Sequence, residues 1–271
     1  MKPAALTSNR SGEGGEPAFI AEMRPDLEDK VDQALCQLED GAVKEAGDRI
    51  KSLLQANPHY HTTNYAMGVY LAKVEEDFRA ARPYFEKAVE IFPIFPEAQF
   101  NLGAAAIKTC KLPKAIAAFR AAARYSRPDD GIAEMARDQL RFIETTVLQG
   151  APFKSLDDYL ANARLFDEAF QCLTDRQFEQ AAQMFQQVLD QVPNHVQSHG
   201  NLALAYAGLG KKAAALECLD KALALDPGYE PARINRLNIV TMREGEPGLR
   251  DGIEEINYYQ DRFDEKGERR S

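Results

Sequence analysis

Prolines recur along this chain at a regular spacing, and that spacing constrains the fold more than any other feature. Pro58, Pro93, Pro128, Pro193 and Pro227 follow one another at intervals close to one or two units of about 34 residues. Proline lacks an amide hydrogen and clashes within a helix interior, so each one marks a place where a helix ends. The sequence therefore predicts repeated helical units.

Small and bulky residues recur upstream of each proline. An alanine and a bulky apolar residue stand one helical turn apart, and so share one helix face, in five pairs: Ala46 and Ile50, Ala81 and Phe85, Ala115 and Phe119, Ala181 and Phe185, Ala215 and Leu219. A second small residue comes earlier in each unit: Ala34, Gly68, Gly103, Ala169 and Ala203. Small residues at these places let two helices approach closely, so each unit is predicted to be a helical hairpin.

The pattern resembles the tetratricopeptide-repeat family. Its match is strong in one stretch, which carries Asn201, Leu202, Ala203, Tyr206, Gly210, Ala215, Leu219, Ala222 and Pro227. The resemblance implies an all-α, right-handed superhelical solenoid of antiparallel helix-turn-helix repeats. One hairpin cannot bury its apolar face alone, whereas stacked neighbours can.

The register of the repeats divides the chain into five predicted parts. Residues 1–26 are rich in Gly, Ser, Glu and Pro and form a disordered arm, and 27–129 form a first block of three repeats. Junction helices occupy 130–161, and 162–263 form a second block with two clear repeats and a degenerate third that keeps Leu249, Ile253 and Ile256. A charged tail, 264–271, completes the chain.

The amino-acid composition limits the kinds of partner and the cellular compartment that we expect. The formal net charge is −9 and no run of Lys and Arg is dense enough to track phosphates, so nucleic acid is not an expected partner. The start of the chain has no continuous apolar segment, which predicts neither a signal peptide nor a membrane anchor and favours the cytoplasm. The four cysteines are far apart and share no metal-type spacing, so they are expected to be reduced thiols.

Two pairs of histidines are candidate metal ligands. His59 and His61, and His195 and His199, lie near boundaries between units, where polar residues are ordinary, and no Cys or carboxylate stands at convincing ligand spacing. The chain also lacks a phosphate loop, a nucleophile elbow and a paired-Cys motif. We therefore expect no metal, no cofactor and no enzymatic activity; a metal- or nucleotide-dependent enzyme would need residues that the sequence does not offer.

The resemblance implies that the first helix of each repeat lines a concave groove for a peptide or protein partner. The groove candidates are Val31, Leu35, Tyr65, Val69, Lys73, Phe100, Ile107, Lys108, Phe166, Phe170, Asn201, Leu204, Ile234 and Asn238. Tyr65, Phe100 and Phe166 stand at one equivalent place, which predicts an apolar stripe. The family's clamp for a C-terminal carboxylate is absent, because Val31, Leu35 and Glu97 stand where its polar and cationic residues belong.

Two alternatives remain open at this level. The stripe is covered by the protein itself if the junction helix or the C-terminal segment folds over it, since amphipathic stripes usually pack into a core. Alternatively, the chain is a structural or self-associating subunit that uses its convex face and end caps, as the degenerate last unit with Tyr258, Tyr259 and Phe263 suggests. The sequence does not determine the oligomeric state.

Overall fold

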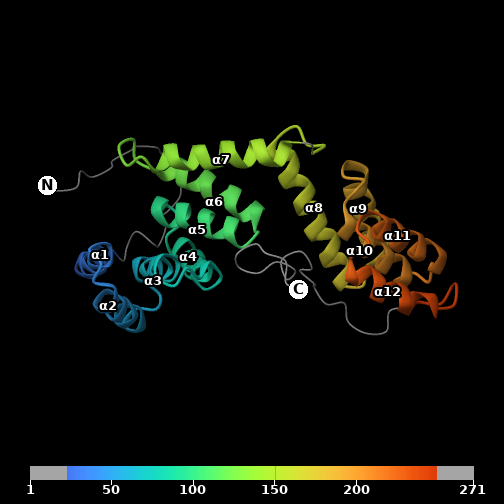
Figure 1. The fold of residues 1–271 in the computed structure, drawn as a ribbon, viewed down its shortest axis with the longest axis horizontal. Helices are drawn as coiled ribbons and strands as arrows, with labels where there is room; N and C mark the ends of the chain where they lie inside the picture. The colour runs from blue at the N-terminus through green and yellow to red at the C-terminus, as the bar shows by residue number, and fades with distance from the viewer. Residues whose placement is uncertain (1–22, 150, 249–271) are drawn as a thin grey trace, which may run out of the picture. The chain divides into compact units, whose positions relative to one another are not determined.

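The structure is a computed structural model that describes residues 23–149 and 151–248. Within these ranges it is an all-α helical repeat fold without a strand (Figure 1). Five pairs of neighbouring helices form hairpins: α1 (Pro25–Glu39) with α2 (Val43–Ala56), α3 (His61–Lys73) with α4 (Phe78–Ile91), α5 (Pro96–Lys108) with α6 (Leu112–Tyr125), α8 (Leu156–Thr174) with α9 (Phe178–Gln191), and α10 (Val196–Gly208) with α11 (Lys212–Leu225). α7 (Ile132–Leu148) and α12 (Glu230–Val240) complete the described helices.

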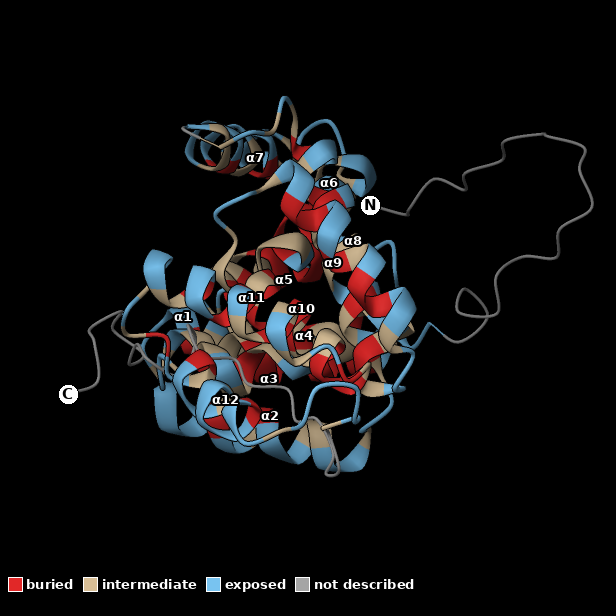
Figure 2. Ribbon diagram, turned by 90° about the vertical axis from the view of Figure 1, so that its right-hand side faces the viewer, coloured by how far each residue is buried: buried red, intermediate tan, exposed pale blue. Residues whose placement is uncertain are grey.

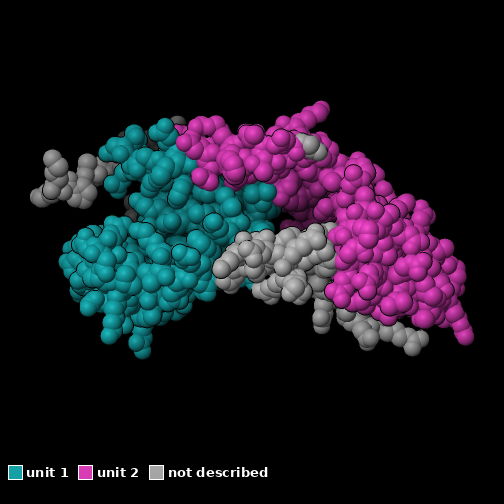
Figure 3. All heavy atoms as spheres, in the orientation of Figure 1, with its two compact units in different colours: residues 1–136 teal, residues 137–271 magenta. Residues whose placement is uncertain are grey.

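The chain divides into two compact units, residues 1–136 and 137–271 (Figure 3). The division falls within α7, so α1 to α6 belong to unit 1 and α8 to α12 to unit 2. Residues 1–22 of the predicted arm, the predicted tail and the residues 249–263 of the degenerate repeat lie outside the described residues, and so do Tyr258, Tyr259 and Phe263. The division into blocks stays a prediction.

Each hairpin turn uses one residue in the left-handed backbone region. This residue is Gly41, Glu76, Cys110, Arg176 or Gly210. Such a residue commonly follows the last turn of a helix, because it reverses the chain and satisfies free carbonyl groups there. Glycine adopts this conformation without strain, whereas Glu76, Cys110 and Arg176 are non-glycine residues held at positive φ. The turn geometry therefore recurs even where the preferred residue does not.

Close helix approach in unit 1 depends on two glycines. A Cβ added to Gly68 would lie 2.6 Å from the Phe85 ring, and one added to Gly103 would lie 2.7 Å from the Phe119 ring. Both phenylalanines are fully buried. The predicted role of the small residue, which is to let the two helices of a hairpin approach, is confirmed at these crossings.

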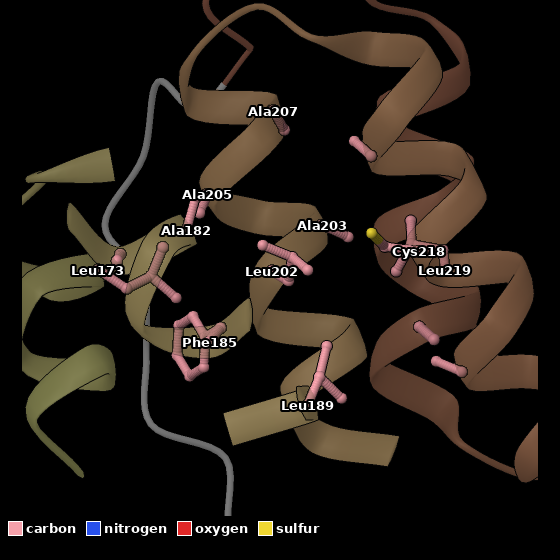
Figure 4. Packing of buried hydrophobic residues seen from close by; sticks show 14 of the residues in the cluster. Leu173, Ala182, Phe185, Leu189, Leu202, Ala203, Ala205, Ala207, Cys218 and Leu219 are labelled. Atoms are coloured by element: carbon pink, nitrogen blue, oxygen red, sulfur yellow. The ribbon is translucent and has the colours of Figure 1, made fainter. Parts of the chain in front are cut away.

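The core lies between the helices of successive hairpins, where the buried positions of facing helices meet (Figure 2). In unit 2 the core is centred on α10. Figure 4 shows Leu202 directed towards Phe185 and Leu189, with Cys218 and Leu219 packed beyond Ala203. The small side chains of α10 therefore hold α9 and α11 close to its two sides.

Candidate functional site

Tyr65 and Phe100 lie on the first helices of neighbouring hairpins in unit 1, and a hydrogen bond links those helices. The Asn101 Nδ2 donates to the Tyr65 hydroxyl oxygen over 3.1 Å. The Tyr65 ring centroid lies 4.9 Å from that of Phe95. Burial raises the pKa of Tyr65 to about 12, and the nearby carboxylate of Glu97 contributes in the same direction. The hydroxyl therefore keeps its proton at neutral pH.

Tyr65, Phe100 and Phe166, which share one place in the repeat, each contact a buried phenylalanine in the same way. Each half-buried ring packs against the buried phenylalanine on the second helix of its own hairpin, with centroid distances of 6.1 Å for Tyr65 and Phe85, 5.4 Å for Phe100 and Phe119, and 5.7 Å for Phe166 and Phe185. Such tilted or edge-to-face pairs are favourable beyond the area they bury. The three aromatic side chains are therefore held in place from beneath while part of each stays exposed.

The two predicted lysines are exposed and already have interaction partners. The Lys73 Nζ lies 3.2 Å from the Glu39 Oε1, and the Lys108 Nζ lies 5.8 Å from the centroid of the Phe78 ring. Leu35, Val69 and Ile107 are half-buried beside them. The first helices of unit 1 thus present apolar side chains together with a few exposed charges.

Val31 does not belong among the predicted groove residues. It is 1% exposed and belongs to the core of unit 1, so it does not face a partner. Its place in the repeat matches that of Tyr65, but the valine side chain is short and belongs to the buried core, against which Leu35 and Tyr65 pack. The repeat register therefore gives the direction of a side chain but not its exposure.

In unit 2 the predicted residues fall into two groups. Phe166, Phe170 and Leu204 are half-buried and pack against the core cluster, and Asn201 is half-buried on the same helix as Leu204. The Phe166 ring also meets the His195 ring edge-on at 5.2 Å. By contrast, Ile234 is 51% exposed and Asn238 is exposed, both on α12.

Three polar side chains whose shared role the sequence did not single out hold the start of a repeat. Side chains at one equivalent place donate to the carbonyl oxygen of the preceding proline: Asn64 to Pro58 over 3.1 Å, Gln99 to Pro93 over 2.9 Å and His199 to Pro193 over 2.8 Å. We call these three residues the proline anchors. A polar residue six positions after each proline was visible in the sequence and could have revealed them.

The histidines considered as metal ligands have structural surroundings. His61 is buried and its ring lies 4.7 Å from that of Phe92, and burial lowers its pKa while Glu28 opposes the shift. Burial also lowers the pKa of His195, with a contribution from His199. His59 is exposed. Among the described residues, no group of three or more His, Cys, Asp or Glu gathers closely enough to hold a metal ion.

One family profile and several solved structures are similar to parts of this chain. The family profile described as Tetratricopeptide repeat matches residues 66–131 and 173–230, one stretch in each unit. No curated protein matches the sequence. In the described part of the chain, none of the helices has the length and apolar character that crossing a membrane requires.

Three of the similar solved structures are as follows. YrrB, described as a TPR protein with an unusual peptide-binding site, is 19% identical with a TM-score of 0.35 over 82% of this chain and 98% of its own. The P58(IPK) TPR domain is 17% identical with a TM-score of 0.42 over 79% and 64%. The yeast Sti1 TPR2AB domain, solved in a complex with pHSP90, is 15% identical with a TM-score of 0.37 over 79% and 83%.

Proposed function

Since this chain belongs to the tetratricopeptide-repeat family, whose members generally mediate protein–protein interactions, we propose that it is a non-enzymatic module that binds a peptide segment of a partner protein. The contact face is formed by the first helices of the hairpins. It comprises Leu35, Tyr65, Val69, Lys73, Phe100, Ile107 and Lys108 in unit 1, and Phe166, Phe170, Asn201 and Leu204 in unit 2. The observation that carries this proposal is the set of half-buried aromatic rings, each supported by a buried phenylalanine.

The chemistry of the face in unit 1 favours an apolar segment without a terminal carboxylate. Tyr65 and Phe100 offer ring surface, and the Tyr65 hydroxyl, which accepts from Asn101, keeps a hydrogen to donate to a peptide carbonyl. The carboxylates of Glu97, Glu39 and Asp32 all raise the pKa of Tyr65, so they generate a negative potential at its hydroxyl. A negatively charged peptide end is therefore disfavoured there, and the ligand is expected to bind through internal aromatic or aliphatic residues.

Affinity capture from a cell lysate tests the proposal. The double substitution Tyr65→Ala with Phe100→Ala removes both rings and is expected to abolish capture of a partner that the unaltered chain binds. Ile94→Ala with Tyr125→Ala serves as the matched control, because both residues are exposed in the same unit but lie off the first helices. Circular dichroism must show that all variants keep their helices. Capture that survives the loss of both rings would overturn the proposal.

A second candidate function, self-association, is favoured by α12. Ile234, Leu237 and Val240 lie on this helix at helical spacing and are 51%, 73% and 46% exposed. An exposed apolar row of this kind suits a second copy of the chain, which could bury the same row of its own α12. Light scattering is expected to detect dimers that Leu237→Glu dissociates. A monomer at high concentration would contradict this candidate.

The proposal includes a cytoplasmic location and the absence of catalysis. The cytoplasm suits four cysteines that are expected to be thiols, all of which are free in the structure. Fractionation of the source cells with an antibody against the chain tests the location. Detection of the protein in a secreted or membrane fraction would reject it.

A further inference from the structure

A groove runs between two second helices in unit 2. α9 and α11 both pack against α10 rather than against each other, so α10 forms the floor between them. Two adjoining cavities of about 300 Å³ and 450 Å³ lie along this groove, and both are lined by Gln186 and Tyr206. None of the face residues proposed above lines either cavity. The groove is therefore a separate feature of unit 2.

The groove reaches apolar side chains at its base, and the carboxylates and lysines that line it are equal in number. The smaller cavity reaches Leu189, Leu202 and Cys218, and burial raises the pKa of the Cys218 thiol to about 11, so the thiol stays uncharged. Glu217 and Lys221 also line the smaller cavity and form an ion pair with each other over 2.8 Å. The larger cavity is lined by one acid and one base, Glu179 and Lys211. Although the whole chain is strongly acidic, the groove therefore favours an uncharged ligand.

Glutamines along α9 supply hydrogen-bonding groups at the edge of the groove. Gln183, Gln186 and Gln187 are exposed and line the larger cavity. Gln186 donates to Asp190 over 3.0 Å, whereas Gln183 and Gln187 have no hydrogen-bond partner among the described residues. A carboxamide both donates and accepts, which complements the N–H and C=O groups of a peptide main chain. The edge of the groove is thus suited to an extended backbone.

The corresponding place in unit 1 is bridged by an ion pair. Glu86 on α4 and Lys114 on α6 approach within 2.6 Å across α5. In the repeat register, Glu86 follows Phe85 as Gln186 follows Phe185, and Lys114 precedes Ala115 as Ala214 precedes Ala215. Both Gln186 and Ala214 line the smaller cavity of unit 2. In unit 2, the uncharged Gln186 and the short Ala214 thus stand where unit 1 has the ion pair of Glu86 and Lys114. No ion pair therefore crosses the groove of unit 2 at this place.

We propose that this groove of unit 2 binds an uncharged, extended peptide segment of a partner protein. An aliphatic side chain of the segment enters the smaller cavity above Leu202, and the main chain bonds to the free carboxamides of Gln183 and Gln187. A helix of 14 residues such as α9 extends for about 21 Å, which matches about six residues of extended chain. This site does not depend on the face proposed for the first helices.

Methyl NMR of the full chain with labelled leucines tests the site. The probe is the capped peptide acetyl-Ala-Ala-Leu-Ala-Ala-Ala-amide. Saturable shifts are expected at the Leu202 methyl groups and not at those of Leu102, the equivalent residue in unit 1. Replacing the peptide's leucine by alanine removes buried aliphatic carbon and is expected to weaken binding about tenfold or more. Peptides with lysine or glutamate in place of that leucine are expected to bind more weakly than the leucine peptide.

A transplanted bridge provides the matched variant. Gln186→Glu with Ala214→Lys copies the ion pair of unit 1 and is expected to weaken peptide binding about tenfold or more. Ala214→Leu fills the same cavity without charge and gives a second test. Glu86→Gln with Lys114→Ala changes unit 1 only and is expected to leave the Leu202 shifts unaltered, as is Tyr65→Ala with Phe100→Ala.

Four results would overturn the proposal: no saturable shift at Leu202, equal shifts at Leu102 and Leu202, tighter binding of the charged peptides, or unchanged binding in both groove variants. Thermal unfolding monitored by circular dichroism shows whether each variant is folded. Loss of binding in a folded Ala214→Leu variant supports the site even if the double variant is unstable.

Discussion

Two of the three hairpin crossings in unit 1 use glycine, whereas both crossings in unit 2 use alanine. In unit 1, Gly68 and Gly103 lie against Phe85 and Phe119, and neither crossing has room for a methyl group. In unit 2 the equivalent place holds alanine, and Ala169 and Ala203 are fully buried. The repeat pattern thus specifies a small residue, whereas the tightness of each crossing depends on the particular pair that meets there.

The largest expected effect comes from adding the missing methyl group to unit 1. Alanine is a better helix former than glycine by about 1 kcal/mol, so propensity alone predicts that Gly103→Ala stabilises the fold. The clash with the buried Phe119 ring predicts instead a loss of about 1–3 kcal/mol. Urea denaturation decides between the two signs.

The crossing of Ala203 and Leu219 in unit 2 suggests a control for Gly103→Ala. Phe119→Leu, combined with Gly103→Ala, reproduces the alanine and leucine found at Ala203 and Leu219. This double variant is expected to recover part of the stability that Gly103→Ala loses, because the smaller side chain makes room for the methyl group. A stabilised single variant would show that the crossings in the two units are equally roomy.

A smaller effect is expected at the proline anchors, which occur in both units. His199→Leu removes the donor to the Pro193 carbonyl and is expected to cost about 0.5–1.5 kcal/mol in the free energy of unfolding. His199→Gln introduces the donor that Gln99 uses in unit 1 and is expected to cost less. Equal losses in the two variants, measured by denaturant unfolding, would mean that the hydrogen bond is not what the imidazole contributes.

The ion pair between Glu86 and Lys114 in unit 1 is expected to contribute less to stability. Lys114→Ala breaks the ion pair with Glu86, but both side chains are partly solvated, so the expected loss is about 0.2–1 kcal/mol. The loss is expected to shrink in high salt. A salt-independent loss above this range would point to packing by the lysine stem rather than to charge.

The last effect appears only as the pH falls below neutral, because protonation of His61 and His195 opposes folding. Burial lowers the pKa values of His61 and His195 in the folded state, so the unfolded chain binds protons more readily. Their contribution to stability is present above the unfolded pKa of about 6.5 and declines as the pH falls from there towards the lowered folded values. Thermal unfolding is expected to show a shallower loss between pH 7.5 and 5.5 in His61→Gln and His195→Gln than in the unaltered chain.

The acid sensitivity of the two units should differ. Glu28 lies 3.9 Å from the His61 imidazole and favours its charged form, whereas His199 disfavours the charged form of His195. His195→Gln is therefore expected to flatten the pH dependence more than His61→Gln. Indistinguishable pH profiles for the two variants would reject this comparison.

The helical repeats were predictable because they depend on local rules. Proline commonly ends a helix, although Pro83 lies inside α4, and a small residue marks a close crossing, so the places of Gly68 and Phe85 in the repeat could be predicted from the sequence. The anchors are equally local, since Asn64 follows Pro58 by the same interval as His199 follows Pro193, but the sequence alone does not distinguish an anchor from an ordinary polar turn residue.

The partner-facing surface was less predictable because exposure depends on neighbouring side chains. Val31 and Tyr65 share one place in the repeat, yet the valine is buried and the tyrosine is partly exposed. The groove beside Gln186 and Ala214 depends on a side chain that is too short to reach across, and only a comparison with Glu86 and Lys114 reveals it. Such features become visible when helices are placed next to each other.

The proline anchors have a consequence for how such a chain can be edited. Each anchor joins the loop that closes one hairpin to the first helix of the next, within a span of six residues. The joint between successive hairpins thus includes a hydrogen bond whose donor and acceptor both lie within one short segment. A cassette cut from one proline to the next should carry its own joint with it, so that hairpins can be duplicated, deleted or exchanged without redesigning their neighbours.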